Sequence, residues 1–426
     1  MRLLDRLKRS SFARDTGHLT LGQGLRLVIQ AVYFVLIARI LGPSRYGAFA
    51  AIVALAGVLT PFSGLGTNNL FVKNVRSGKR SASVCWGNGL AATMVSGSVF
   101  VAIVFAIDIL FRLRIPLGVI AGICCSDLIL MRVTELAMFG FGAIDRMKDN
   151  AIQAVVSSAL RLAAIAILAP FGHRVTLLWW TWAYVAATAA GTGYAVYRAY
   201  RSWGRPEFDL PSLIADVREG IYFSVGTAAA TIYNDIDKVM LSGYSFAEVG
   251  IYAAAYRIID VSMTPVRALV SAAYPHFFRY GVGGMRPAYA YARTQIGRAC
   301  LYSVVLGPAL WIGAPLLPHL VGASYAQTVP ALRWLAFLPL IRSVHSFLAD
   351  SLSGAGLQGL RCAIQVAVAA VNVGLNLLIL PRYGWLGATW TSLASDGLLL
   401  LSLWIAVQFK LSRQTQTSLA TADVAL

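Results

Sequence analysis

The sequence predicts an all-α integral membrane protein with about twelve transmembrane helices in two six-helix bundles, related by a pseudo-two-fold axis along the membrane normal. Three observations lead to this prediction. Apolar residues make up 58% of the 426 residues and charged residues only 13%, and the mean hydropathy is +0.67. Long apolar segments recur along the whole chain, and a short stretch repeats across its midpoint. A soluble fold of this composition would lack the polar surface that it needs.

Twelve segments are long and apolar enough to cross a bilayer, since a helical crossing takes about 20 apolar residues. The first, Leu19 to Ile40, follows a basic stretch. It is too long for the core of a signal peptide and lacks a convincing cleavage site, so we interpret it as a retained helix. The predicted spans are 19–40, 46–66, 87–110, 116–140, 151–171, 176–198, 220–242, 249–275, 298–320, 329–350, 361–380 and 387–408.

The basic residues predict the topology. Of the 36 Lys and Arg residues, 22 lie in the N-terminal segment and in the connections on its side of the membrane, 6 lie on the opposite side and 8 lie within spans. Lys and Arg favour the cytoplasmic side, so we expect both termini to be cytoplasmic. This distribution explains most of the formal charge of +18. Nucleic-acid binding is not indicated, because the sequence has no basic stripe or binding motif.

The internal repeat predicts how the spans are grouped. Residues 42–50 (GPSRYGAFA) resemble residues 243–253 (GYSFAEVGIYA), and a Thr-Pro pair follows each copy, at 60–61 and at 264–265. Because an even number of spans precedes the second copy, the two halves have parallel orientations, as in some transporters. We expect an N-terminal six-helix bundle in 1–198, a cytoplasmic linker in 199–219, and a C-terminal six-helix bundle with a short cytoplasmic tail in 220–426.

The sequence has no motif for catalysis or for a cofactor. Its five cysteines include no pair at metal-ligand spacing, and the odd number argues against a complete disulfide framework. A Gly-rich phosphate loop, a nucleophile elbow and a His-Glu metalloprotease helix are all missing from the sequence. We therefore expect no enzymatic activity, no cofactor and no metal site.

Several spans carry charged residues near their middles, most densely at residues 234–238 (NDIDK). An ionisable side chain in hydrocarbon costs several kcal/mol, so it generally faces a bundle interior or a wet cavity. Such a polar pathway through a membrane is typical of transporters.

Two regions resemble a known family. Residues 235–257, with their acidic pair and the stretch VGIYAAAYRI, resemble the polysaccharide biosynthesis family of oligosaccharide-lipid flippases, within the multidrug/oligosaccharidyl-lipid/polysaccharide exporter superfamily. Residues 39–49 (RILGPSRYGAF) resemble the first hairpin of that family, and residues 64–66 (GLG) resemble the end of its second helix.

The resemblance implies a Wzx-type flippase of the bacterial inner membrane. Such a protein moves undecaprenyl-diphosphate-linked oligosaccharide from the cytoplasmic to the outer leaflet by alternating access, for O-antigen, capsule or exopolysaccharide biosynthesis. The implied partners are the lipid-linked oligosaccharide, the bilayer, H⁺ or Na⁺ as coupling ion, and polysaccharide polymerase and assembly proteins.

A diphosphate that crosses a low-dielectric barrier needs fixed positive charge along its route. In the first span, Gln23, Arg26, Gln30 and Tyr33 fall within an arc of about 80° on a helix that turns about 100° per residue. Arg26 is thus a candidate phosphate ligand. The alternative is that Arg26, only about 10 Å into the span, extends toward the cytoplasmic headgroups.

The seventh and eighth spans carry further candidates. Asp235 and Lys238 are three residues apart and share one helix surface, whereas Asp237 faces nearly the opposite side. Asp235 and Arg257 lie at comparable depth and are predicted either to form a structural pair or to exchange partners when phosphate arrives. We assign Arg26, Lys238, Arg257 and, as a secondary candidate, Arg161 to substrate binding, and Asp235 and Asp237 to cation coupling.

Other polar residues within spans are interpreted as structural. Arg132 and Glu135 form a self-contained pair in the fourth span, and Asn372 and Asn376 are expected to form hydrogen bonds between helices. Arg342 and His345 share a face of the tenth span and stay outside the predicted site.

Two other functions remain open at this point. A cation-coupled multidrug-type antiporter would have a cavity dominated by acids and aromatic residues, which the eight basic residues within spans oppose. A membrane-embedded polymerase or glycosyltransferase would be expected to have a large loop with catalytic residues, and no connection here is long enough.

Overall fold

The computed structural model describes the backbone of residues 2–111 and 115–423, and side chains within 24–414 apart from 111–114, 222, 225–227, 229 and 230. Within these residues the chain is almost entirely helical and has no strand, which confirms the all-α prediction. Gln23 of the predicted polar stripe, and Arg112 and Arg114 of the topology prediction, lie outside the described side chains. The chain divides into two compact units, residues 1–239 and 240–426.

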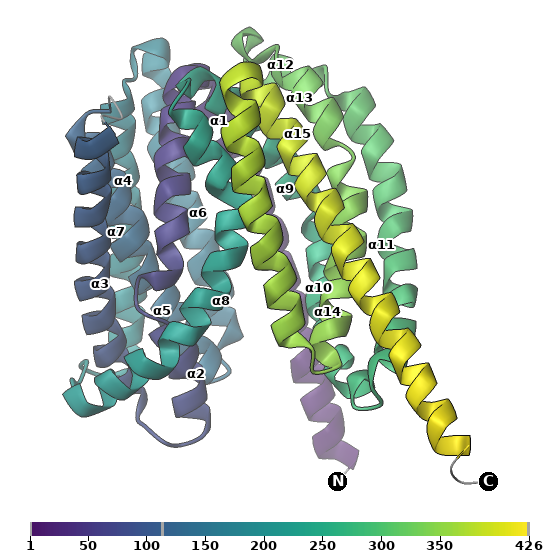
Figure 1. Ribbon diagram of the computed structural model, residues 1–426. Coiled ribbons are helices and arrows are strands. Elements are labelled where there is room, and N and C mark those ends of the chain that lie inside the picture. Colours follow the sequence, from purple (N-terminus) through teal and green to yellow (C-terminus); the bar gives the residue numbers. More distant parts are fainter. Residues whose placement is uncertain (1, 112–114, 424–426) are drawn as a thin grey trace. The chain divides into compact units, whose positions relative to one another are not determined.

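The first unit contains every element before α8 and the part of α8 up to Val239 (Figure 1). They are α1 (Arg2–Leu59), η1 (Thr60–Phe62), α2 (Thr67–Arg76), α3 (Ala82–Phe111), α4 (Leu117–Cys125), the π-helix η2 (Ser126–Leu130), α5 (Met131–Ala143), α6 (Met147–Leu168), η3 (Ala169–Arg174), α7 (Leu177–Trp203) and α8 (Leu210–Ser242). Helix α6 packs along both α1 and α7.

The second unit contains the end of α8 and the remaining elements. They are α9 (Phe246–Ser262), α10 (Thr264–Gly281), α11 (Met285–Gly313), α12 (Leu316–Val321), η4 (Ala323–Tyr325), α13 (Thr328–Leu335), α14 (Leu338–Gly354) and α15 (Gln358–Asp423). Within this unit α14 packs against both α11 and α15.

Seven helical stretches of the described chain are long and apolar enough to cross a membrane. Two of them are too long for one crossing. The stretch Gly24–Phe62 has 39 residues, so it would span about 58 Å as one straight helix, whereas the hydrocarbon core is about 30 Å thick. It breaks at Gly42, whose φ of 69° favours glycine. The stretch Gln358–Gln414 breaks similarly at Gly384, where φ is 52°. Figure 1 shows both α1 and α15 rising and then descending, so each contributes two antiparallel helices.

The two copies of the internal repeat occupy corresponding positions. The first lies at the break of α1 at Gly42, and the second lies in the turn between α8 and α9. The Thr-Pro pair that follows each copy begins a helical element, η1 in one case and α10 in the other. Proline suits the first turn of a helix because the amide hydrogen that it lacks has no partner there.

The predicted linker is shorter in the structure than in the sequence analysis. Helix α7 continues to Trp203 and α8 starts at Leu210, so residues 204–209 are the non-helical part of the predicted segment 199–219. The compact units meet at residue 239, within α8. The division into bundles 1–198 and 220–426 stays a prediction.

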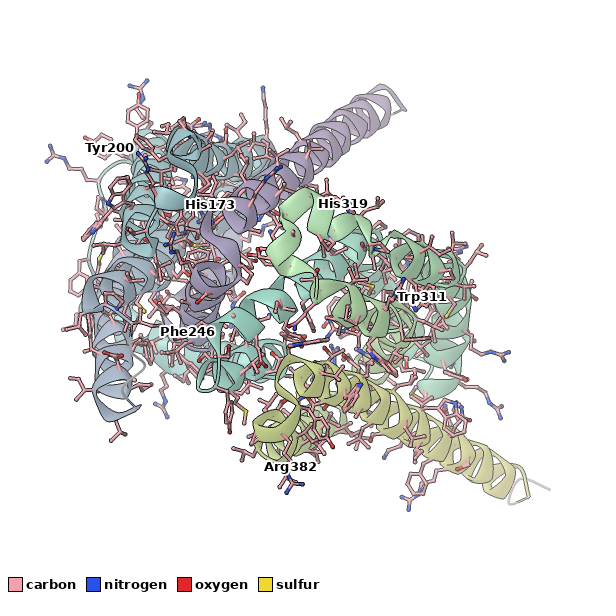
Figure 2. The ribbon with its side chains drawn as sticks, turned by 90° about the horizontal axis from the view of Figure 1, so that it is seen from above. His173, Tyr200, Phe246, Trp311, His319 and Arg382 are labelled. Carbon is pink, nitrogen blue, oxygen red and sulfur yellow. The ribbon has the colours of Figure 1, made fainter. Side chains whose placement is uncertain are left out.

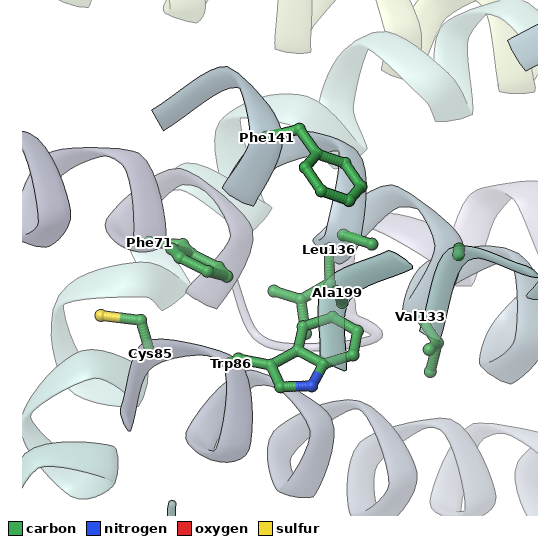
Figure 3. Close-up of a cluster of buried hydrophobic side chains, with 9 residues drawn as sticks. Phe71, Cys85, Trp86, Val133, Leu136, Phe141 and Ala199 are labelled. Atoms are coloured by element: carbon green, nitrogen blue, oxygen red, sulfur yellow. The ribbon is translucent and has the colours of Figure 1, made fainter. Parts of the chain in front are cut away.

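An apolar core holds four helices of the first unit together. It contains Phe71 from α2, Trp86 from α3, Phe141 from α5 and Ala199 from α7 (Figure 3). The ring of Trp203, at the end of α7, lies 5.0 to 5.5 Å from the three aromatic rings of this core. Aromatic pairs at this spacing stabilise beyond their buried area. Trp203 thereby fixes one end of α7, the helix that carries part of the candidate site.

Large apolar and charged side chains project from the outer surfaces of the units (Figure 2). Tyr200 is 49% exposed at the periphery of the first unit, and Arg382 is exposed at the periphery of the second. Exposed apolar side chains in such number are expected for helices that face lipid rather than water.

Candidate functional site

A cavity of about 250 Å³ lies among α1, α5, α6 and α7 of the first unit. Two predicted substrate-binding residues line it, Arg26 from α1 and Arg161 from α6. Its remaining wall is rich in small polar side chains. The lining consists of Arg26, Gln30, Met131, Thr134, Glu135, Met138, Ala154, Ser157, Ser158, Arg161, Ala187, Thr188 and Gly191. The structure thus brings together two arginines that are far apart in the sequence.

Local helix geometry explains why these side chains reach one cavity. Arg26 and Gln30 are four residues apart on α1, so they share one face of the helix, as the predicted polar stripe requires. Ser157 and Arg161 have the same spacing on α6. Because α6 packs along both α1 and α7, these faces converge.

Aromatic and acidic side chains surround the guanidinium of Arg161. Its guanidinium carbon lies 5.1 Å from the centroid of the Tyr184 ring on α7. The Tyr184 hydroxyl donates a 2.6 Å hydrogen bond to Oδ1 of Asp127, and Arg161 interacts electrostatically with both Asp127 and Tyr33. Arginine stacks well on aromatic rings because its charge is delocalised and weakly hydrated.

Some polar atoms at this cavity lack a partner. The Arg161 Nε and the Thr188 Oγ1 are buried without a hydrogen bond to any described residue. Buried polar atoms in folded proteins are nearly always hydrogen-bonded, so unsatisfied ones call for an explanation. A guanidinium and several hydroxyls around a small cavity can donate hydrogen bonds to a phosphate oxyanion or contact a sugar.

A second cavity of about 380 Å³ lies next to the first and shares Glu135 with it. Arg132 also lines this cavity, and it forms an ion pair with Glu135. This contact confirms the pair predicted from the three-residue spacing. Residues from α1 to α8 supply the rest of the lining, namely Gly57, Thr60, Pro61, Gly66, Asn68, Asn69, Phe139, Phe223, Ser224 and Thr231.

The charged residues near the end of α8, Asp235, Asp237 and Lys238, already interact with one another. Lys238 forms an ion pair with Asp235, three residues earlier, as their predicted shared surface allows. Asp237 is buried at 3% exposure, and its carboxylate accepts the Lys238 backbone N–H at 2.8 Å. The structure does not bring Lys238, Asp235 or Asp237 into the cavity that Arg26 and Arg161 line.

Arg257 lies on α9 in the second unit, half-buried, and the described residues form no ion pair with it. Asp235 belongs to the first unit and Arg257 to the second. Their predicted pairing therefore stays a prediction, as does the role of Arg257 in substrate binding.

The second unit contains a buried charge network that the sequence analysis missed. Asp396 on α15 is 1% exposed and accepts hydrogen bonds from Arg342 at 3.0 and 3.1 Å and from His345 at 3.1 Å. Arg342 also donates a hydrogen bond to the Tyr256 hydroxyl. Since Asp396 has partners on both oxygens, we interpret this network as structural.

The predicted interhelical asparagines are confirmed. Asn372 donates a 2.9 Å hydrogen bond to Ser395, and Asn376 accepts a 2.7 Å hydrogen bond from Thr391. The two asparagines lie before the break of α15 at Gly384, and their partners lie after it. These contacts join the two antiparallel parts of α15.

Asp127 and Asp396 are the residues that sequence reasoning overlooked. Both are acids within predicted spans, so the same rule that singled out the intramembrane bases could have found them. No group of three or more metal-ligating side chains occurs in the described part of the chain.

The membrane-length helices and the buried charges between them define a multi-pass integral membrane protein. A family model described as "Polysaccharide biosynthesis protein" matches residues 12–281. The chain belongs to this family.

The chain is also similar to a curated relative and to solved structures. It is 25% identical over 354 residues to the succinoglycan biosynthesis transport protein ExoT of Rhizobium meliloti (strain 1021), covering 80% of this chain and 69% of the relative. It shares its fold with an inward-facing multidrug resistance MATE family transporter of the MOP superfamily (TM-score 0.75, 14% identity, 92% of this chain and 96% of that one). The lipid II flippase MurJ in an inward closed conformation matches with a TM-score of 0.75 and 11% identity, over 92% of this chain and 87% of that one.

Proposed function

We propose that this family member is a flippase for undecaprenyl-diphosphate-linked oligosaccharide repeat units. It moves them from the cytoplasmic to the outer leaflet of the bacterial inner membrane by alternating access, for the synthesis of O-antigen, capsule or exopolysaccharide. Both termini face the cytoplasm in this proposal, as the distribution of Lys and Arg suggests.

The observation that carries the proposal is the cavity shared by Arg26 and Arg161. In a low-dielectric membrane interior, two guanidinium groups offset the cost of bringing in a diphosphate. Each charge-assisted hydrogen bond contributes about 1.5 to 3 kcal/mol. Hydroxyls from Ser157 and Thr188 add neutral donors beside them. A cavity of about 250 Å³ suits a phosphate or one sugar, so the polyprenyl chain stays in the bilayer.

The names of similar proteins favour the same substrate class. MurJ is described as a flippase of lipid II, and ExoT as a transport protein of succinoglycan biosynthesis. The family description itself refers to polysaccharide biosynthesis. A lipid-linked saccharide is the kind of substrate that connects these descriptions.

Lys238 and Arg257 are retained in the proposal as further phosphate contacts along the route, and Asp235 and Asp237 as cation-coupling residues. The ion pair between Lys238 and Asp235 supports a partner exchange, because phosphate can replace the carboxylate beside Lys238. The released Asp235 then binds H⁺ or Na⁺. Interaction with polysaccharide polymerase and assembly proteins completes the proposed role.

Binding of a diphosphate lipid tests the proposal. Purified native protein in detergent is heated with undecaprenyl diphosphate or with uncharged undecaprenol, and the melting temperature is recorded. A ligand at 100 times its Kd stabilises the folded state by about 2.7 kcal/mol. We expect stabilisation by the diphosphate only, and its loss in Arg26→Ala and Arg161→Ala. Stabilisation by cationic dyes instead of the diphosphate would favour the alternative, a cation-coupled multidrug-type antiporter.

A further inference from the structure

One turn of the helix that runs from α4 to α5 is a π-helix, at Ser126–Leu130. Proline and glycine are both missing from this turn, so its sequence does not by itself demand an irregular backbone. Side chains from other elements stabilise it instead. The Leu128 carbonyl accepts a hydrogen bond from Ser63, and the Leu130 carbonyl accepts one from Thr192 at 2.9 Å. Single π-helical turns inside α-helices are frequent at functional sites.

The π-helix carries Asp127, which Tyr184 connects to Arg161. Asp127 is 7% exposed, and its carboxylate accepts the hydrogen bond from the Tyr184 hydroxyl. The aromatic ring of Tyr184 contacts Arg161, whose guanidinium carbon lies 5.1 Å from the ring centroid. Tyr184 therefore connects the acid and the base through two different parts of one side chain.

The Arg161 guanidinium therefore has two possible anionic partners, a ligand in the cavity and the Asp127 carboxylate. It lines the cavity, whereas Asp127 is not one of the residues that line it. Its attraction to Asp127 acts over space, because no hydrogen bond or ion pair joins these two described side chains and Asp127 is hydrogen-bonded to Tyr184 instead. A carboxylate that attracts a guanidinium without binding it directly leaves that group able to take another anion.

We infer that Asp127 is an internal competitor of the substrate phosphate for Arg161, positioned by Tyr184 and by the π-helix so that the site can release its anion. This inference rests on the proposed function. Two arginines facing one phosphate in a low-dielectric cavity would hold it too firmly for rapid turnover. A negative charge behind one of them weakens the bound state and promotes exchange. The Tyr184 hydroxyl stabilises that charge and so keeps Asp127 in its ionised form.

The inference predicts tighter anion binding for two conservative variants. Asp127→Asn removes the negative charge but keeps an oxygen that can accept the Tyr184 hydrogen bond. Removing one like charge from the surroundings of a bound anion in a low-dielectric interior tightens its binding on the order of tenfold. Tyr184→Phe keeps the ring beneath Arg161 but leaves the Asp127 carboxylate without its hydroxyl donor. A buried carboxylate that loses its hydrogen-bond donor favours its neutral form, so the charge that competes for Arg161 is reduced and anion binding tightens about threefold.

Inorganic pyrophosphate is the probe, because it carries the diphosphate charge without the lipid. Its Kd is measured by calorimetry on the purified full-length chain, and the melting temperature of each variant is recorded. Asp149→Asn is the matched control. Asp149 is also a buried acid, but it pairs with Arg146 and Arg198 and does not line the cavity, so its loss should leave the Kd unchanged.

Each result has a defined meaning. Tighter binding by Asp127→Asn, together with slower lipid transfer at saturating substrate, supports the inference, because a purely structural residue would weaken binding when it is replaced. If the native protein binds pyrophosphate and Asp127→Asn binds it equally or more weakly, the inference is wrong. The proposed function is unaffected by that result. A native chain that does not bind pyrophosphate contradicts the proposed function itself. If Asp127→Asn does not fold, Tyr184→Phe decides, since unchanged or weaker binding there also overturns the inference.

Discussion

Replacing Asp396 by Asn should destabilise the second unit strongly. The side chains of Arg342 and Asp396 are 13% and 1% exposed, and Arg342 donates two hydrogen bonds of 3.0 and 3.1 Å to a single carboxylate oxygen. Neutralising the carboxylate leaves a buried guanidinium whose charge is no longer compensated. Breaking one side of a buried ion pair costs about 3 to 5 kcal/mol. We therefore expect Asp396→Asn to lower the free energy of unfolding by this amount.

Thermal unfolding in detergent measures the change, and a double-mutant cycle with Arg342→Met isolates the pair. The double variant should be more stable than the sum of the single losses predicts, with a coupling energy of about 2 kcal/mol. Asp260→Asn is the control, because Asp260 pairs with Arg267, whose side chain is 58% exposed. An exposed pair contributes about 0 to 1 kcal/mol. If Asp396→Asn costs no more than this control, the reasoning that buried charges hold α14 and α15 together is wrong.

Three further predictions concern the first unit, and thermal unfolding in detergent checks all of them. Trp203→Ala opens a cavity among the aromatic rings of the core and should lower the free energy of unfolding by about 3 to 5 kcal/mol. Trp179 is the control, because its side chain is 48% exposed and Trp179→Ala should lower the same free energy by about 0.5 kcal/mol or less. Equal losses would contradict the placement of the core. Gly66→Val should cost at least about 2 kcal/mol, because φ is 74° and a Cβ would collide with a backbone carbonyl of α8. The Lys73 ammonium donates a hydrogen bond that holds the pKa of the exposed Glu219 below its usual range. The stability from this pair is present at neutral pH and is lost as the pH falls through that lowered pKa. Lys73→Ala should therefore flatten the acid side of the plot of stability against pH. At neutral pH it should change the melting temperature little. An unchanged acid profile in Lys73→Ala would show that the pair does not form.

Helix positions were predictable because hydropathy is a property of consecutive residues. Each predicted span coincides with one helix or with consecutive helices, although α11 starts at Met285 rather than near 298. Pairs within one helix were predictable for the same reason. The three-residue spacing that joins Arg132 to Glu135 also joins Asp235 to Lys238.

Contacts between distant helices were harder to predict. Asp396 meets Arg342 across 54 positions, and nothing in the sequence near either residue specifies the other. The π-helix at Ser126–Leu130 depends on hydrogen bonds from Ser63 and Thr192, which are remote in sequence. The convergence of Arg26 with Arg161 likewise results from the packing of α6 along α1. Helix faces can be read from the sequence, but their partners depend on the tertiary structure.

Lipid transfer by the reconstituted protein tests the central claim most directly. Undecaprenyl-diphosphate oligosaccharide is placed in one leaflet of proteoliposomes, and its appearance in the other is followed for the native chain, Arg26→Ala, Arg161→Ala and the peripheral control Arg382→Ala (Figure 2). Each cavity arginine contributes about 1.5 to 3 kcal/mol through charge-assisted hydrogen bonds, which corresponds to about a 10- to 150-fold loss. We expect the native chain and the Arg382→Ala control to transfer the lipid at similar rates. Each cavity variant should transfer it about 10 to 150 times more slowly. Undiminished transfer in both cavity variants would contradict the assignment of the anion site, and no transfer by the native chain, together with efflux of cationic dyes, would contradict the flippase.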